Sequence, residues 1–230
     1  MEGGVKVATA GLVVINQIRR AVLRGEWEPA GTLRPVALAE RFGTSTTVIR
    51  EALTRLAGDG IVVMKPNRGF FVPELNLREL GDITELRCVS EALAAGLALE
   101  RGDVEWESEL IAAHHRLART PRREASDVNH LSEEWSAAHR AFHAKLLEAS
   151  DCPQMIRLSA NLADATELYR RWAAPSPAAA IRDVEKEHQE ILDAALARDA
   201  DKLSALLRSH FEATVQVVLD AGLGEGQRPL

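Results

Sequence analysis

Cysteine is scarce in this sequence of 230 residues, which contains only Cys88 and Cys152. The two lie far apart and outside any CxxC pair, which argues against a disulfide scaffold and a cysteine-based zinc site and fits a reducing compartment. Long apolar runs are lacking too. The run Val13–Ile15 is too short for a signal-peptide core, and no segment approaches membrane-spanning length. We therefore expect a cytoplasmic protein without a membrane partner.

Aromatic residues make up only 4% of the chain, and neither proline nor glycine is enriched. Alanine and leucine are abundant instead, which favours helices over sheets. With 46% hydrophobic and 27% charged residues, the composition is that of an ordinary globular protein. The length suits one large domain or two small ones.

The net charge of −6 is unevenly distributed along the chain. Residues 1–76 contain ten Lys or Arg and seven Asp or Glu, for a net charge of +3, and the remainder contains 18 and 27, for −9. This asymmetry suggests two domains with different partners. A charge of +3 is too small to establish nucleic-acid binding without further signals.

The first third has the pattern of three helices followed by a β-hairpin. Apolar residues at 12, 15, 18 and 22 have helical spacing. A second helix begins at Pro35 and ends at Gly43, and hydroxyl residues then cap a third that ends at Gly58 or Gly60. The stretch "IVVMKPNRGFFV" changes to a strand pattern with a turn at Pro66–Asn67. This order predicts a winged helix-turn-helix, which lays its recognition helix in the DNA major groove.

The segment "STTVIREALTRLAGDGIVVMKPNRGFFV" resembles the DNA-binding module of GntR-type bacterial transcription regulators. The resemblance extends over roughly sixty residues. Thr46 stands where the family often has Arg, Val48 where it has Pro, and Val36 where it often has another Arg. Because usual base or phosphate contacts are missing, the family's operator preference does not transfer. Arg34 or Arg41 is a candidate to compensate.

Arg50 is the first candidate for a DNA contact, since it lies in the early turns of the recognition helix. Its alternative role is that of an exposed helix arginine paired with Glu51 or Thr54. The wing-tip residues are phosphate candidates, or simply polar turn residues. The predicted DNA-binding set is Arg34, Ser45, Thr46, Thr47, Arg50, Lys65, Asn67, Arg68 and Gly69.

The rest of the chain has helical periodicity throughout, after a linker at 73–77. The predicted helices are 78–101, 103–119, 127–149, 153–173, 178–198 and 200–221. We therefore expect a mainly α protein. A winged helix-turn-helix domain at 1–76 precedes an all-α helical-bundle effector domain at 77–222, and a disordered tail follows at 223–230.

The stretch "AHRAFHAKLL" places His139 and His143 four residues apart on an apolar stripe. That stripe contains Val128, Leu131, Trp135, Phe142 and Leu146. His188 lies on the inward face of the helix predicted at 178–198, together with Ile181, and His210 lies on the inward face of the last helix. Burial favours the neutral imidazole that binds metal. Positions i and i+4 lie about 6 Å apart along a helix, so both can reach one ion.

Other interpretations of these histidines stay open. Each histidine alone is typical of a core imidazole bonded to a carbonyl or carboxylate. "HRAFH" has the spacing of a zinc-protease helix, but Arg140 occupies the place of the Glu base. "EKEH" at Glu185–His188 is one ExxH, whereas a di-iron bundle needs two and two further Glu. We expect His114 to be structural and His115 and His130 to lie at the surface.

The stretches "HRAFHAKLLEAS" and "EKEHQEILDAALARDADKL", with the later His210, resemble the FCD effector-binding domain of the FadR subfamily of GntR regulators. Members with a metal typically use an Asp, a His four residues later, and two further His. His143, His188 and His210 match those three His positions, and His139 stands in place of the Asp. An all-imidazole set suits zinc first and nickel next. The resemblance implies one divalent ion per chain.

Many relatives sense small organic carboxylates, and the resemblance therefore implies such an effector at the metal. Arg87, in "ELRCVSE", is the candidate partner for its charge, or else forms an ordinary intramolecular ion pair. We expect a cavity lined by Trp135, Phe142 and Leu146. Taken together, the sequence predicts a homodimeric regulator of a palindromic operator, a repressor and not an enzyme. A metal-sensing regulator and a helical metalloenzyme fused to a DNA-binding module are the alternatives.

Overall fold

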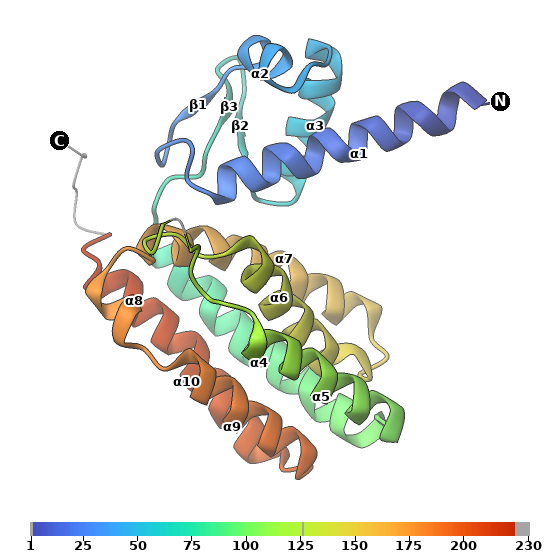
Figure 1. Cartoon of the computed structure of the whole chain (residues 1–230), viewed down its shortest axis with the longest axis vertical. Coiled ribbons are helices and arrows are strands. Elements are labelled where there is room, and N and C mark those ends of the chain that lie inside the picture. The colour runs from blue at the N-terminus through green and yellow to red at the C-terminus, as the bar shows by residue number, and fades with distance from the viewer. Residues whose placement is uncertain (1, 126, 224–230) are drawn as a thin grey trace. The chain divides into compact units, whose positions relative to one another are not determined.

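The computed structural model describes residues 2–125 and 127–223 (Figure 1). The chain divides into two compact units, with the boundary between Leu75 and Asn76. The boundary expected from the sequence, after residue 76, lies one residue further along. Within the described residues, no helix has both the length and the apolar character needed to cross a membrane. The tail expected at 223–230 falls outside the described residues except for its first residue.

The first unit contains three main helices and a small sheet. Its elements are α1 (Glu2–Leu23), β1 (Thr32–Leu33), α2 (Pro35–Phe42), α3 (Thr46–Gly58), β2 (Val63–Lys65) and β3 (Gly69–Phe71). The strands pair antiparallel in the order β1-β3-β2, with Lys65 opposite Gly69 at the tip of the β2–β3 hairpin. The predicted winged helix-turn-helix is confirmed.

Local signals in the sequence account for the helix-turn-helix. Pro35 begins α2, and Gly43 ends it with a φ of 62°, a left-handed conformation that glycine adopts without strain. The side chain of Ser45 caps α3 by accepting a hydrogen bond from the Val48 amide at 3.3 Å. Ile49 and Leu53 then bury one face of α3 against α1 and α2.

The first helix is longer than the sequence analysis predicted. It begins at Glu2 rather than near residue 12, because no proline interrupts the segment before that point. Its buried face contains Val14, Ile18 and Val22, while Leu12 is about half exposed. Gly25 follows the helix with a φ of 72°, close to its predicted end.

The second unit is a helical bundle in which α4 lies against α7 and α10, and α5 against α6 and α9 (Figure 1). Its buried core includes Leu110, Phe142, Ile191 and Leu207. The helices are α4 (Leu77–Arg101), α5 (Val104–Arg119), α6 (Glu133–Glu148), α7 (Pro153–Ala173), α8 (Pro177–Ile181), α9 (Val184–Leu196) and α10 (Ala200–Asp220). The mainly α fold class is confirmed.

Two predicted helices are wrong in extent. The helix predicted at 127–149 begins only at Glu133, where the side chain of Ser132 caps it. Val128 therefore lies outside this helix and is exposed, so it does not belong to the buried stripe that the sequence predicted. The helix predicted at 178–198 breaks after Ile181, which is 86% exposed. Asp183 caps the start of the next helix, α9, because its side chain accepts a hydrogen bond from the Lys186 amide at 3.0 Å. In both places a capping side chain outweighs the apolar periodicity.

Candidate metal centre and nucleic-acid interface

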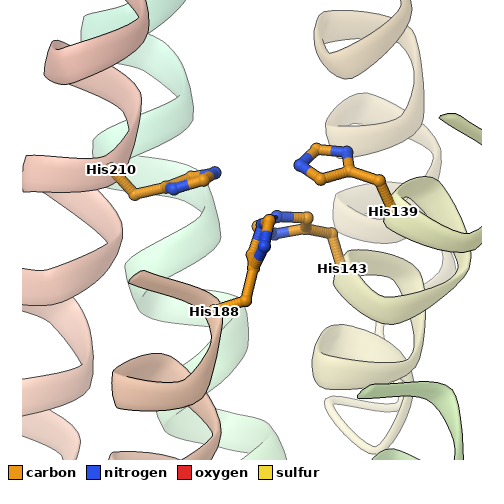
Figure 2. A group of neighbouring side chains, drawn as sticks. All are labelled: His139, His143, His188 and His210. Carbon is orange, nitrogen blue, oxygen red and sulfur yellow. Dashed lines mark hydrogen bonds between the residues drawn. The ribbon is translucent and has the colours of Figure 1, made fainter. Parts of the chain in front are cut away.

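Four histidine side chains converge in the bundle: His139 and His143 from α6, His188 from α9 and His210 from α10 (Figure 2). Each offers one ring nitrogen that lies within 4.8 Å of the others. All four side chains are buried, with 2% to 6% of each residue exposed. The structure therefore brings together every residue of the predicted metal set.

Burial determines the charge of this histidine cluster. It lowers the pKa of His139, His143 and His188 well below the usual value, and neighbouring imidazoles and guanidinium groups act in the same direction. Burial also lowers the pKa of His210 to about 4, although Glu187 opposes the shift. At neutral pH the cluster consists of neutral imidazoles, the form that donates a lone pair to a metal.

Glu187 fixes the orientation of His210. Its Oε2 lies 2.6 Å from Nδ1 of His210, and Arg182 contacts both carboxylate oxygens, with Nε at 2.8 Å and Nη2 at 2.7 Å. Burial would raise the pKa of Glu187, but the hydrogen bonds from His210 and Arg182 lower it to about 2. The carboxylate therefore accepts a hydrogen bond from Nδ1–H of His210 and leaves the lone pair of Nε2 available to a metal, an arrangement usual around metal-bound histidines.

The other histidines also have ring nitrogens suited to an ion. Nε2 of His143 lies 3.4 Å from Nε2 of His188. Among the described residues, Nδ1 of His143 has no hydrogen-bond partner although it is buried. These imidazoles are neutral and close to one another, and one buried ring nitrogen has no hydrogen-bond partner among the described residues. Such a set of ligands suits a divalent ion such as zinc or nickel.

His139 has a cationic neighbour that the sequence analysis missed. Nη1 of Arg170, on α7, lies 2.9 Å from Nδ1 and 3.2 Å from Nε2 of the His139 ring. Arg170 also forms an ion pair with Glu167, which accepts a further hydrogen bond from Arg171 at 2.7 Å. Its spacing of three residues from Glu167 is equally typical of a solvated helix face, so the sequence carried no signal for this contact. His139 must give up one contact with Arg170 to bind an ion.

A cavity of about 130 Å³ lies beside the cluster, lined at one end by Arg87, His139, His143 and Arg170. Arg87 is buried, donates from Nε to Oε1 of Glu91 at 2.7 Å, and lies over the ring of Phe211 at 4.0 Å. Arg87 thus forms the intramolecular ion pair that was its alternative role, and it also lines the cavity.

The predicted cavity lining is right for Trp135 and wrong for Phe142 and Leu146. Phe142 and Leu146 are buried in the hydrophobic core of the bundle and line neither the cavity of about 130 Å³ nor the one of about 30 Å³. Trp135 lines the cavity of about 30 Å³, together with His139, His210 and Arg182. The remaining histidines lie outside the cluster: His114 is buried with its ring 5.4 Å from that of Phe142, and His115 and His130 are exposed.

The first unit has four exposed or partly exposed cations around one groove: Arg34, Arg50, Lys65 and Arg68. Asn67 and Gly69 line the same groove at the hairpin turn, with φ angles of 57° and 100°. Ser45, Thr46 and Thr47 are exposed at the start of α3. Arg41 is bound instead to Glu26, so Arg34 is the better placed of the two candidates to compensate for the missing arginines.

The sequence matches known protein families over both the histidine cluster and the groove of the first unit. The model of the family described as "FCD domain" matches residues 82–213, more than half of the chain, and the model described as "Bacterial regulatory proteins, gntR family" matches residues 11–72. The chain belongs to the GntR family of transcription regulators, with an FCD domain. Both resemblances inferred from the sequence are thereby confirmed.

Individual relatives agree with the family match. The chain is 33% identical over 208 residues to the HTH-type transcriptional regulator BphR of Paraburkholderia xenovorans, covering 90% of this chain and 84% of that protein. It is 28% identical over 210 residues to the HTH-type transcriptional repressor GlaR of Escherichia coli, covering 90% and 94%. The structure of E. coli McbR/YncC has the same fold, with a TM-score of 0.71 at 23% identity and coverage of 91% and 97%. BphR and GlaR are both named as transcriptional regulators, not as enzymes.

Proposed function

We propose that this GntR-family regulator binds a palindromic operator as a homodimer, and that a small carboxylate bound at a metal in the FCD domain controls its operator affinity. The observation that carries the proposal is the cluster of four neutral imidazoles beside a cavity lined by three guanidinium groups, those of Arg87, Arg140 and Arg170. A ligand changes operator binding only if it has different affinities for two states of the protein. Because DNA is its partner, we place the protein in the cytoplasm.

The predicted DNA-binding residues fall into two classes. Arg50, at the start of the recognition helix, is proposed to contact a base edge in the major groove. Arg34, Ser45, Thr46 and Thr47, together with Lys65, Asn67, Arg68 and Gly69 of the wing, are proposed to bind phosphates and set the register of the protein on DNA.

The metal proposal assigns His139, His143, His188 and His210 as ligands of one divalent ion per chain, zinc first and nickel next. When bound, the ion supplies Lewis-acid attraction for the oxygen atoms of the acid. Glu187 holds the tautomer of His210, and Arg87 and Arg170 supply positive charge to the carboxylate. Four imidazoles leave two positions on a six-coordinate nickel, whereas zinc must expand beyond four ligands to accept the acid.

An exposed apolar stripe on α4 supports the homodimer. Leu86, Val89 and Leu93 are 45%, 62% and 58% exposed and lie along one face of the helix. Arg78 and Glu100 lie eleven residues before and after Val89. An antiparallel pairing of two α4 helices centred on Val89 therefore sets Arg78 against the partner's Glu100, as a two-fold interface requires.

Light scattering tests this dimer with Val89→Glu, which should halve the mass in solution. The matched control is Val104→Glu, at an exposed valine on α5, which should leave the mass unchanged. A dimer that survives Val89→Glu would exclude this interface.

Fluorescence anisotropy tests the function as a whole, with a duplex enriched by in vitro selection for binding to the full chain. The proposal expects operator affinity to change at least fivefold when 2-hydroxypentanoate is added to zinc-loaded protein, and to stay constant in chelated protein. The direction of the change in operator affinity shows how the regulator acts. Weaker operator binding in the presence of the acid indicates a repressor that its effector releases from DNA. Organic acids that act equally without metal would contradict metal-dependent control.

One observation favours metal sensing as a second candidate function. Four buried imidazoles suffice to complete a tetrahedral zinc shell with no position for an acid. In that case, zinc alone at micromolar concentration changes operator affinity, and organic acids add nothing. The same anisotropy titration, with zinc and without acid, distinguishes the two.

A further inference from the structure

The cavity of about 130 Å³ has a polar end beside the histidine cluster. Arg87, His139, His143, Glu167 and Arg170 line it there, on α4, α6 and α7, and Glu167 is already paired with Arg170 and Arg171. Nε of Arg170 and Nδ1 of His143 are buried and lack a hydrogen-bond partner among the residues that the structure describes. Buried polar atoms without partners are costly, so this end is built to take a ligand with polar atoms of its own.

The walls between α6 and α7 are different in character. They are mostly small or apolar side chains: Ala144, Leu147, Ile156, Ala160 and Ala163, with Ser159 and Arg140 as polar lining residues. Arg140 is already bound to Asp164. A second carboxylate at this end would lose its hydration against apolar walls and face the negative charge of Asp164, which is unfavourable.

Resting on the proposed function, we infer that the effector has a single carboxylate and a short apolar chain, and that Ala144 and Ala163 determine which chain lengths fit. The carboxylate lies at the imidazole and guanidinium end, and the chain lies between α6 and α7. A sealed apolar cavity of roughly 150 Å³ holds a benzene ring. By that measure, this slightly smaller cavity accepts about five non-hydrogen atoms, enough for the carbon chain of a four- or five-carbon acid whose oxygen atoms lie among the histidines.

Calorimetric titration of the zinc-loaded full chain tests the inference with three acids that share one chelating head. Lactate has the short chain, 2-hydroxypentanoate adds two methylene groups, and 2-hydroxyglutarate has five carbons but a second carboxylate. Each buried methylene group contributes about fourfold in affinity. We expect 2-hydroxypentanoate to bind at least tenfold more tightly than lactate and at least tenfold more tightly than 2-hydroxyglutarate.

Ala163→Leu tests the walls directly, because the larger side chain occupies the volume meant for the ligand chain. We expect 2-hydroxypentanoate to lose its advantage and bind within threefold of lactate, while lactate affinity and zinc content stay the same. The matched control is Ala141→Leu, at an exposed alanine of α6 that does not line the cavity. If Ala163→Leu does not fold, Ala144→Leu replaces it, because Ala144 is exposed and lines the cavity.

The outcomes separate this inference from the function on which it rests. If 2-hydroxyglutarate binds as tightly as 2-hydroxypentanoate, or lactate does, the inference is overturned and acid control of the regulator stands. If the Ala163→Leu or Ala144→Leu variant keeps the full preference for the longer chain, the ligand chain does not lie against these alanines and their assignment is wrong. If none of the three acids binds zinc-loaded protein, the proposed effector class and the inference fail together.

Discussion

Arginine side chains lie in opposite environments in the two units. In the DNA-binding unit, Arg34, Arg50 and Arg68 are exposed around one groove. In the FCD domain, Arg87 and Arg171 are buried and bound to carboxylates, and Arg170 contacts both Glu167 and His139. Exposed charges are screened by salt, whereas buried pairs are screened much less. Salt should therefore govern DNA binding, and metal and pH should govern the effector site.

Removing the buried ligands should give the largest contrast between the units. The double variant His143→Ala, His188→Ala leaves at most two of the four imidazoles, so metal content should fall from about one ion per chain to nearly none. Elemental analysis of purified protein measures this, with His115→Ala as the control at an exposed histidine. Operator binding should remain but no longer respond to acid. Unchanged metal content in the double variant would exclude the assigned site.

Acid should destabilise the FCD domain of metal-free protein over a defined range. The pKa of His210 is about 4 in the folded state, below its usual 6.5, and the other three imidazoles shift in the same direction. The folded state then binds fewer protons than the unfolded state, so the free energy of unfolding falls as pH drops from about 6.5 to about 4. His210 alone accounts for about 3 kcal/mol of that fall.

Urea unfolding of chelated protein at several pH values within this range measures the effect. His210→Gln should flatten the dependence on pH, whereas His115→Gln should leave it unchanged. Glu187 contributes in the same direction but mainly below this range, because its pKa is about 2 in the folded state against a usual 4.5, and its stabilisation is lost as pH falls between those values. Equal pH dependence in the parent and His210→Gln would show that burial of His210 does not set its pKa.

The smallest of these effects is expected for the exposed arginines of the DNA-binding unit. Arg50→Ala should weaken operator binding by about 1–3 kcal/mol if the side chain contacts a base, without changing metal content. Arg55→Ala, at another exposed arginine of α3 that does not line the groove, is the control. Gel-shift affinity equal to the parent would remove Arg50 from the DNA contacts. The affinity of both proteins should fall steeply with added salt.

Helical periodicity and turn residues were sufficient to predict most of the fold. Pro35, Gly43 and Ser45 act through local backbone chemistry, so the helix-turn-helix could be inferred without tertiary information. The errors at Val128 and Ile181 arose because apolar spacing continued through segments where Ser132 and Asp183 cap a new helix. Capping competes with periodicity, and sequence alone does not show which prevails.

The histidine cluster could be inferred because each of its members lies on an inward helical face. Arg170 could not, because an arginine three residues after a glutamate is typical of a solvated helix face, and only the packing of α7 against α6 brings it to His139. The cavity walls were missed for a related reason. Whether Phe142 or Ala163 faces empty space depends on how closely two helices approach, and side-chain periodicity does not encode that distance.

X-ray absorption at the zinc edge of the zinc-loaded full chain shows which atoms surround the ion. We expect a first shell of nitrogen atoms at about 2.0–2.1 Å, with the multiple scattering of four imidazole rings. Adding 2-hydroxypentanoate should introduce oxygen atoms into that shell. Sulfur scattering at about 2.3 Å, or a shell without imidazoles, would contradict the assignment of the histidine cluster as the metal centre of this regulator.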